Sequence, residues 1–158
     1  MSVTPQTNTD LAALAAAFKQ RDDFVLCGHV SPDGDCIGSQ LALAAALRQL
    51  GKRVTCVLAK NEPIDERLRF LPGADDLVPA ELYEGPARTF VAVDVPTRER
   101  IAEAAAALRD QCDLAVTIDH HAVDTTMTDL VYVDPDAAST TVLVWDVAGL
   151  LGVDRSGD

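Results

Sequence analysis

The sequence predicts an α/β fold. Short apolar runs of the kind found in strands buried on both faces alternate with longer, Ala-rich segments of helical periodicity. The chain has 158 residues, of which 48% are hydrophobic and 24% charged, and this suffices for one domain with a substantial core. Such alternation is typical of a doubly wound, mostly parallel sheet of Rossmann-like type with helices on both faces.

The N-terminal part of the chain predicts a helix, a strand and a second helix. The segment 10–21 is amphipathic and has Asp10 as a candidate N-cap. The apolar run 24–28 ends in glycine and suits a buried strand. Helical spacing then extends from 36 to 50 and ends before Gly51, which favours a glycine C-cap.

The central part predicts two strands separated by a short helix. The apolar run 53–58 completes a strand–helix–strand unit. The segment 64–76 has the composition of a short helix that ends at Pro72-Gly73. The continuous apolar run 89–95 is typical of a buried parallel strand.

The C-terminal part continues the same alternation. Thr97 is placed to cap a helix over 98–109, and the apolar run 114–119 predicts the next strand. A strand over 129–134 and a helix over 137–151 complete the expected fold.

Three of the predicted strands end in polar residues that suit metal binding. His29 follows the first strand, Asp94 closes the run 89–95, and the triplet Asp119, His120 and His121 closes the run 114–119. In doubly wound sheets, ligands bind beyond the carboxyl ends of the strands. We therefore expect these segments, far apart in sequence, to meet at one edge of the sheet.

Composition narrows the functional classes. A formal net charge of −12 with only 13 Lys and Arg argues against a groove for long duplex nucleic acid. The N-terminus lacks the features of a signal peptide, and no segment approaches roughly 18 uninterrupted apolar residues, so we expect a cytoplasmic protein without membrane insertion. The cysteines show no CxxC spacing and are expected to be buried, reduced thiols; Cys36, beside the acidic turn, is a candidate redox-sensitive thiol.

All three histidines of the chain lie beside clustered aspartates, in GHVSPDGDCIGS (28–39) and TIDHHA (117–122). Any single histidine would more often be a hydrogen-bonded core or surface residue. Histidines placed for packing would be scattered, whereas these share acidic turns with the carboxylates that complete a divalent-cation site.

The spacing of the acidic residues favours two metal ions. Asp33 and Asp35 are expected on the same side of a turn in which Gly34 gives conformational freedom, so that they reach adjacent ions, with Asp94 as a bridge. A mixed carboxylate–imidazole set suits Mn²⁺, with Mg²⁺, Co²⁺ or Fe²⁺ as alternatives. Two ions roughly 3.5–4 Å apart activate a water for attack on phosphorus, so the implied reaction is phosphoester hydrolysis.

The motif HVSPDGDCIGS, the strand-terminal Asp94 and IDHH together resemble the DHH family of phosphoesterases, over nearly the whole chain. The form H-x-x-P-D-G-D-x-x-G-S, RFLPGA (69–74) and AAST (137–140) are most similar to the bacterial branch that includes nanoRNase/pAp phosphatases and cyclic-dinucleotide phosphodiesterases.

The resemblance implies a role for each site residue. His29, Asp33 and Asp94 would hold one Mn²⁺, and Asp35, Asp94 and His120 the second. His121 would face the scissile phosphate as a hydrogen-bond donor or acid, and Asp119 would orient the neighbouring imidazoles.

Arg100 and Ser139 are candidate substrate-binding residues. Arg100 follows Asp94 in a family-like stretch, and a structural role is its alternative. Ser139 is equally suited to cap a helix.

Two features of the family lack a counterpart before Asp158, namely a T-D-T-G-like motif with the last metal-binding Asp and a C-terminal substrate-binding domain. Residues 1–158 are thus expected to be an N-terminal DHH catalytic domain that is truncated before both.

The leading hypothesis is a Mn²⁺-dependent hydrolase of short oligonucleotides, pAp or linear and cyclic dinucleotides, with a homodimer as a candidate assembly. A Mn²⁺ inorganic pyrophosphatase is less favoured, because that branch has N-P-D-x-D where this chain has S-P-D-G-D. A regulatory module that binds metal or nucleotide without turnover is the non-enzyme alternative.

Overall fold

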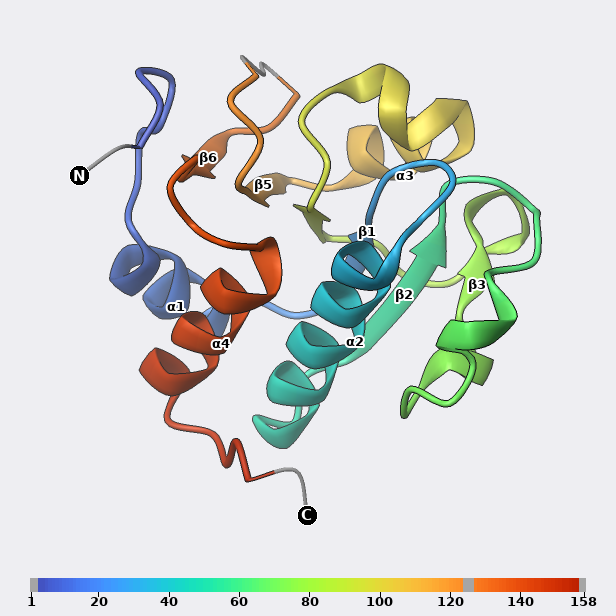
Figure 1. The fold of residues 1–158 in the computed structure, drawn as a ribbon, viewed down its shortest axis with the longest axis horizontal. Coiled ribbons are helices and arrows are strands. Elements are labelled where there is room, and N and C mark those ends of the chain that lie inside the picture. Colours follow the sequence, from blue (N-terminus) through green and yellow to red (C-terminus); the bar gives the residue numbers. More distant parts are fainter. Residues whose placement is uncertain (1–2, 124–126, 157–158) are drawn as a thin grey trace.

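A six-stranded sheet forms the centre of the molecule (Figure 1). The computed structural model describes residues 3–123 and 127–156. The strand order is β3-β2-β1-β4-β5-β6, and every neighbouring pair is parallel, which confirms the predicted doubly wound class. The strands are β1 (Phe24–Cys27), β2 (Val54–Leu58), β3 (Val78–Pro79), β4 (Thr89–Val93), β5 (Leu114–Asp119) and β6 (Leu130–Val133).

Helices cover both faces of the sheet, unevenly. The helices are α1 (Leu11–Lys19), α2 (Gly34–Gln49), α3 (Ala102–Gln111) and α4 (Thr140–Leu151). Figure 1 shows α1, α4 and α2 side by side on one face, with α3 on the other. Side chains alternate accordingly along β1: Phe24 and Leu26 pack toward the three-helix layer, whereas Val25 and Cys27 pack toward α3.

The start of α2 is held against the carboxyl ends of the central strands. The buried side chain of Gln40 donates to the carbonyl oxygens of Leu26 at 2.9 Å and Val57 at 3.0 Å. A Cβ at Gly28 would lie 2.0 Å from the Sγ atom of Cys36, so glycine is required for this close approach. The N-terminal turn of α2 therefore sits directly over the end of β1.

Two predicted helices are wrong in extent or type. The segment 64–76 forms two short 3-10 turns, Glu66–Leu68 and Ala74–Asp76, because the intervening Pro-Gly pair, with Gly73 at φ 89°, interrupts helical propagation. The segment 98–109 begins as a 3-10 turn over Arg98–Ile101, and α3 starts at Ala102, whose φ is 64°. The predicted capping bond from Thr97 is absent among the hydrogen bonds of the described residues.

The other elements agree with the prediction to within a few residues. Asp10 caps α1 as predicted, accepting from the Ala13 N–H at 2.7 Å. The helices predicted from 36 and from 137 begin at Gly34 and Thr140 instead. The edge strand β3 was not predicted, because two residues are too short to give a periodic pattern.

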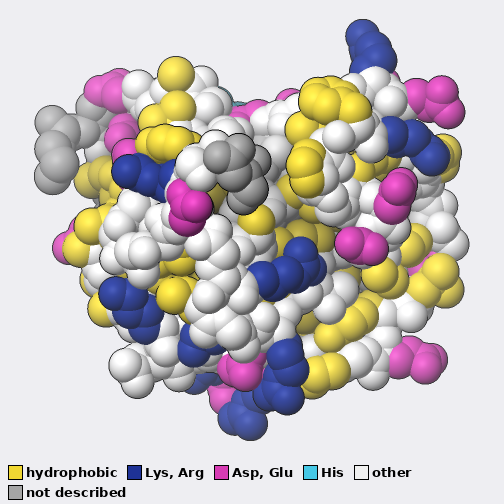
Figure 2. Space-filling model, turned by 90° about the horizontal axis from the view of Figure 1, so that it is seen from below, with side chains coloured by type: hydrophobic (Ala, Val, Ile, Leu, Met, Phe, Trp, Pro, Cys, Tyr) yellow, Lys and Arg dark blue, Asp and Glu magenta, His cyan; other side chains and the backbone are white. Residues whose placement is uncertain are grey.

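The face seen in Figure 2 mixes hydrophobic, acidic and basic side chains and shows almost nothing of the histidines. Several arginines lie where strands begin: Arg53 pairs with Asp23 at 2.8 Å, and Arg88 pairs with Asp113 at 3.1 Å. All four cysteines are buried free thiols, as predicted. Within the described ranges, no helix has the length and hydrophobicity needed to cross a membrane.

Candidate metal centre

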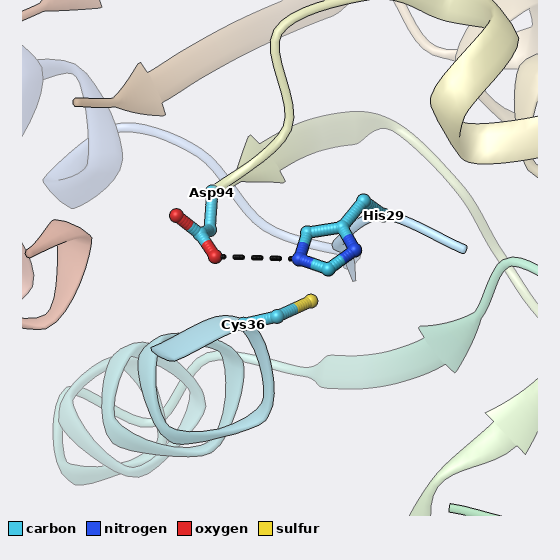
Figure 3. A group of neighbouring side chains, drawn as sticks. All are labelled: His29, Cys36 and Asp94. Carbon is cyan, nitrogen blue, oxygen red and sulfur yellow. Dashed lines mark ion pairs between the residues drawn. The ribbon is translucent and has the colours of Figure 1, made fainter. Parts of the chain in front are cut away.

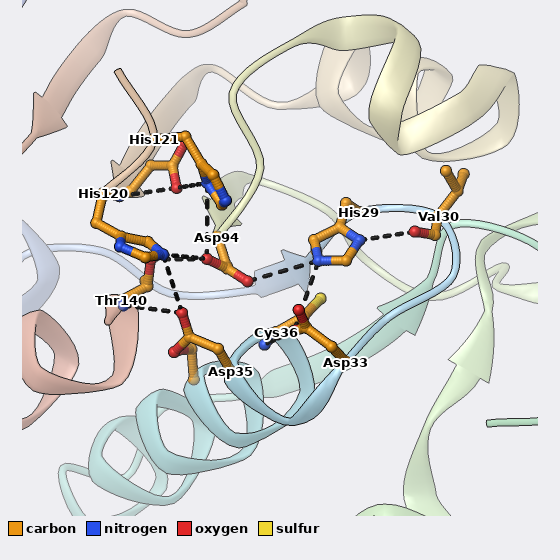
Figure 4. Close-up of polar contacts among 12 residues, drawn as sticks. His29, Val30, Asp33, Asp35, Cys36, Asp94, His120, His121 and Thr140 are labelled. Atoms are coloured by element: carbon orange, nitrogen blue, oxygen red, sulfur yellow. Dashed lines mark hydrogen bonds and ion pairs between the residues drawn. The ribbon is translucent and has the colours of Figure 1, made fainter. Parts of the chain in front are cut away.

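The predicted ligands lie at the point between β1 and β4 where the strand order of the sheet reverses. β1 and β4 are neighbours, but from them the chain proceeds outward in opposite directions, to β2 and β3 on one side and to β5 and β6 on the other. A crevice opens at such a switch point beyond the carboxyl ends of the strands. His29 follows β1, Asp94 follows β4 and Asp119 ends β5. Figure 4 shows His29, Asp94 and His120 close together at this edge of the sheet.

The first group of donor atoms surrounds the imidazole of His29. Its Nε2 atom lies 3.6 Å from Oδ1 of Asp33 and 3.5 Å from Oδ2 of Asp94. Its Nδ1 atom lies 2.6 Å from the carbonyl oxygen of Val30, which can only accept, so Nδ1 donates this hydrogen bond. The opposite nitrogen, Nε2, is thereby directed at the two carboxylates, as is usual for a metal-binding histidine.

The second group surrounds His120. Its Nε2 atom lies 3.3 Å from Oδ2 of Asp35 and 3.4 Å from Oδ1 of Asp94. These separations exceed those of good N–H···O hydrogen bonds, whereas two ligands each about 2.1 Å from one ion lie roughly 3–3.5 Å apart. Each oxygen of Asp94 faces a different group, which is the geometry required of a bridging carboxylate.

The carboxylate of Asp94 is buried and only partly hydrogen-bonded. Its side chain is 1% exposed; Oδ1 accepts from the Thr140 hydroxyl at 3.0 Å, but Oδ2 has no hydrogen-bond partner in the described part of the chain. A buried carboxylate oxygen without a partner is costly unless a positive charge compensates it. The backbone of Asp94 has φ 59°, a conformation rare for residues other than glycine and frequent at functional sites.

Among the described residues, no Lys or Arg forms an ion pair with these carboxylates. In the ion pairs of the described residues, Asp33, Asp35, Asp94 and Asp119 are paired with histidines only. The Asp94 carboxylate raises the pKa of His29. This donor set of carboxylates and imidazoles, with an orphaned buried oxygen at its centre, fits divalent cations such as Mn²⁺.

Asp33 and Asp35 do not share one turn, contrary to the prediction. Asp33 is the N-cap of α2, and its Oδ1 accepts from the Cys36 N–H at 2.9 Å. Asp35 lies inside the first helical turn. Gly34 is a helical residue, and the left-handed residue of this loop is Ser31, at φ 51°.

Asp35 is fixed by the N-terminus of α4. Oδ2 accepts from the Thr140 N–H at 3.0 Å, and Oδ1 accepts from the N–H and hydroxyl of Thr141 at 2.9 and 2.6 Å. Burial alone would raise the pKa of Asp35, but these hydrogen bonds outweigh it and the net shift is downward. The sequence reasoning missed Thr141 as a positioning residue, although a Ser-Thr-Thr run at a helix start is a recognisable signal.

His121 is oriented by Asp119. Its Nδ1 atom donates to Oδ1 of Asp119 at 2.7 Å, and the same oxygen accepts from the His120 N–H at 2.8 Å. Burial raises the pKa of Asp119, and the His121 hydrogen bond partly offsets this shift. The His121 side chain is 44% exposed, so its Nε2 atom is the nitrogen left for a substrate or an ion.

The two predicted substrate-binding residues lie differently. Ser139 caps α4, its hydroxyl accepting from the Val142 N–H at 3.3 Å. Arg100 has an exposed side chain, and its carbonyl oxygen accepts from the Val30 N–H at 2.7 Å, which ties its segment to the loop after β1. A substrate contact by either residue stays a prediction.

A pocket adjoins the first donor group, and the sequence reasoning did not find it. It has a volume of about 270 Å³ and lies between the loops that follow β1 and β2, with His29, Pro32, Lys60 and Ile64 among its lining residues. Lys60 is exposed and forms no ion pair with a carboxylate of the described residues.

Fold and site together define a doubly wound α/β protein whose strand ends present two carboxylate–imidazole groups sharing one aspartate. Residues 23–156 match the family model described as the DHH family, N-terminal domain, and the chain belongs to this family. The resemblance predicted from the sequence is thus confirmed.

Individual proteins support the same assignment. The chain is 36% identical over 130 residues to the bifunctional oligoribonuclease and PAP phosphatase NrnA of Thermus thermophilus, and 30% identical over 145 residues to a probable protein of the same name from Streptococcus mutans. These matches cover 82% and 89% of this chain but only 37% and 43% of the relatives. A crystal structure of an exopolyphosphatase-related protein from Bacteroides fragilis is 25% identical, with a TM-score of 0.80 over 94% of this chain and 46% of that one.

Proposed function

We propose that this chain is the metal-binding catalytic part of a Mn²⁺-dependent, two-metal phosphoester hydrolase that acts on short oligonucleotides, pAp or linear and cyclic dinucleotides. The names of the curated relatives support oligoribonucleotides and PAP as substrates. The chain spans about two fifths of their length, so the substrates rest on the shared portion alone. A cytoplasmic location and a homodimer stay predictions.

One observation carries the proposal. The two oxygens of the buried Asp94 face two different imidazoles, His29 at 3.5 Å and His120 at 3.4 Å, and each imidazole has a further carboxylate beside it. A single-ion site would not need two such groups. When bound there, two divalent ions would lower the pKa of a shared water and neutralise charge on the phosphoryl oxygens.

The remaining side chains would position the substrate and move a proton. Asp119 holds Nδ1 of His121, so Nε2 can donate a hydrogen bond to a phosphoryl oxygen or a proton to the leaving oxygen. Because Asp119 is buried and accepts two hydrogen bonds through Oδ1, it fixes the orientation of this imidazole. The carbonyl oxygen of Val30 fixes His29 in the same manner.

The pocket beside His29 is a suitable place for the part of the substrate away from the scissile phosphate. Pro32 and Ile64 offer apolar surface to a base or sugar, and Lys60 offers a positive charge to a second phosphate. We expect Lys60→Ala to raise KM for a dinucleotide and to leave KM for a small aryl phosphodiester unchanged. Equal effects on the two substrates would show that Lys60 does not bind a second phosphate of the substrate.

The test uses the full gene product, stripped of metal and then loaded with Mn²⁺, Mg²⁺ or Co²⁺. The substrates are pAp, di- to pentaribonucleotides, linear and cyclic dinucleotides, pyrophosphate and polyphosphate, with Asp94→Asn as the matched inactive control. Mn²⁺-dependent release of nucleotides that is absent from Asp94→Asn supports the proposal. Turnover of pyrophosphate or polyphosphate alone would replace it with a phosphoanhydride hydrolase, and nucleotide binding without any turnover would replace it with a regulatory module.

A further inference from the structure

A cysteine thiol lies inside the first donor group. Sγ of Cys36, a ring nitrogen of His29 and a carboxylate oxygen of Asp94 all lie within 4.8 Å of one another, and all three residues are buried. Figure 3 shows the three side chains converging from the loop after β1, the first turn of α2 and the end of β4. The other three cysteines belong to no such group in the part of the chain that the structure describes.

The backbone fixes the position of this thiol. Cys36 lies in the first turn of α2, where its N–H donates to the capping carboxylate of Asp33 at 2.9 Å. Its Sγ atom packs against Gly28 on one side, where a Cβ would lie only 2.0 Å away. The packing of α2 against the loop after β1 therefore fixes the side chain of Cys36 beside His29 and Asp94, without the need for a bound ion.

The sulfur of Cys36 faces the N–H of His29, but the S–H group has no close acceptor among the described residues. Its nearest recorded acceptor is Oε1 of Gln40, at 4.0 Å, the outer limit for a sulfur donor. Asp94 belongs to the same group, and its buried Oδ2 atom, which has no hydrogen-bond partner among the described residues, lies 3.5 Å from Nε2 of His29. These three side chains therefore bring together a sulfur, a ring nitrogen and a carboxylate oxygen in a buried group.

We propose that Cys36 is a further ligand of the ion held by His29 and Asp94, so that this site binds thiophilic divalent ions, such as Zn²⁺, Cd²⁺ or Co²⁺, as well as the Mn²⁺ of the proposed reaction. Thiolates select softer ions, whereas carboxylates suit Mg²⁺ and Mn²⁺. On binding, the S–H bond breaks, a metal–sulfur bond forms and the proton leaves to solvent, with no change of oxidation state. The inference rests on the proposed metal centre but not on its reaction.

The two sites would consequently differ in preference. The second group consists of His120, Asp35 and Asp94, and Asp35 is held by hydroxyl and amide groups of α4. Among the described residues, no cysteine joins the possible metal ligands around His120. A soft ion should therefore fill the site at His29 first, and Mn²⁺ should retain the site at His120. A mixed-metal protein is the expected state when both kinds of ion are present.

The experiment is spectroscopic titration of the metal-free full gene product with Co²⁺, followed by competition with Cd²⁺. Cys36→Ser and Cys36→Ala are the test variants. Cys112→Ala is the matched control, because Cys112 is also a buried thiol but lies just before β5, at the opposite edge of the sheet. Circular dichroism and urea unfolding establish that each variant is folded.

We expect one near-ultraviolet thiolate-to-cobalt charge-transfer band per chain in the parent and in Cys112→Ala, and none in either Cys36 variant. Cd²⁺ affinity should fall by at least about tenfold in Cys36→Ser, since even residues that only orient metal ligands cost this much when removed. Mn²⁺ affinity should change far less. Co²⁺ binding without the band, or a band that survives in folded Cys36→Ser, overturns the inference and leaves the proposed hydrolase intact. Absence of any metal binding overturns both.

Discussion

Gly28→Ala tests whether the thiol of Cys36 lies where the structure places it. The added Cβ would meet Sγ of Cys36 at 2.0 Å and the carbonyl oxygen of Val93 at 3.3 Å. The first contact is far below any tolerated separation, while the second requires a shift of only a few tenths of an ångström. Almost all of the strain should therefore come from the sulfur.

The expected free energies follow from this geometry. Overpacking by one methyl group costs about 1–3 kcal/mol, and a contact as close as this should fall in the upper half of that range. Cys36→Ala alone removes one buried heavy atom and should cost about 1 kcal/mol. In the double variant Gly28→Ala/Cys36→Ala the new methyl group occupies the space left by the sulfur, so the total cost should stay near 1–2 kcal/mol instead of the additive 3–4 kcal/mol.

Urea unfolding of the four proteins in the thermodynamic cycle measures this coupling. Gly38→Ala serves as the control, because it lies in the middle of α2 and its Cβ would meet only the Thr141 hydroxyl, at 3.9 Å. That change should stabilise the protein by about 0.5–1 kcal/mol through helix propensity. Additive costs for Gly28 and Cys36, or a Gly28→Ala variant as stable as the parent, would refute the placement of the thiol and weaken its assignment as a ligand.

Three further predictions address the site. Gln40→Leu should lower the free energy of unfolding by about 2–4 kcal/mol in urea, because two strand carbonyls lose a buried donor; a change below 0.5 kcal/mol would contradict the tie between α2 and the sheet. His121→Ala should retain metal while turnover falls roughly 100–10,000-fold, whereas His120→Ala should lose metal as well; equal metal loss in both, by elemental analysis, would make His121 a ligand. The pKa of His29 is raised above 6.5, chiefly by Asp94. Mn²⁺ affinity measured by calorimetry should therefore rise with pH through that raised pKa. The stability that protonated His29 gives to the metal-free protein should be present below pH 6.5 and lost as the pH rises through the raised pKa. A pH dependence unchanged in His29→Gln would exclude this residue as the titrating group.

The sequence was sufficient to predict the fold class and the edge of the sheet that carries the site. Both follow from patterns that act along the whole chain, namely apolar runs of strand length and polar residues directly after them. Local deviations were not predictable in the same way. The helix expected over 64–76 has suitable composition, but the Pro-Gly pair divides the segment into two short 3-10 turns, and composition alone does not give their lengths. The two-residue strand β3 depends entirely on its neighbour β2.

The residues that gather at the site could be predicted from the sequence, but the contacts that hold them in place could not. Asp33, Asp94 and His120 stand in motifs that can be read directly. The contacts that hold Asp35 come from Thr140 and Thr141, more than 100 residues later, and only the packing of α4 against α2 creates them. The approach of Cys36 to the donor group likewise depends on the angle at which α2 leaves the loop.

The arrangement of these supports explains why Asp94 is the centre of the site. Asp33 caps α2 and Asp35 receives the N-terminal N–H groups of α4, so the charge of both carboxylates is offset by helix N-termini without any ion. Asp94 is not compensated to the same degree: one oxygen has a single hydroxyl donor and the other has none among the described residues. Hydrogen bonds from helix N-termini therefore stabilise the carboxylates of Asp33 and Asp35. The buried carboxylate of Asp94 is the one that a cation would compensate in the proposed metal centre. In the proposed two-metal centre both ions would share Asp94, so the occupancy of one site would be coupled to that of the other.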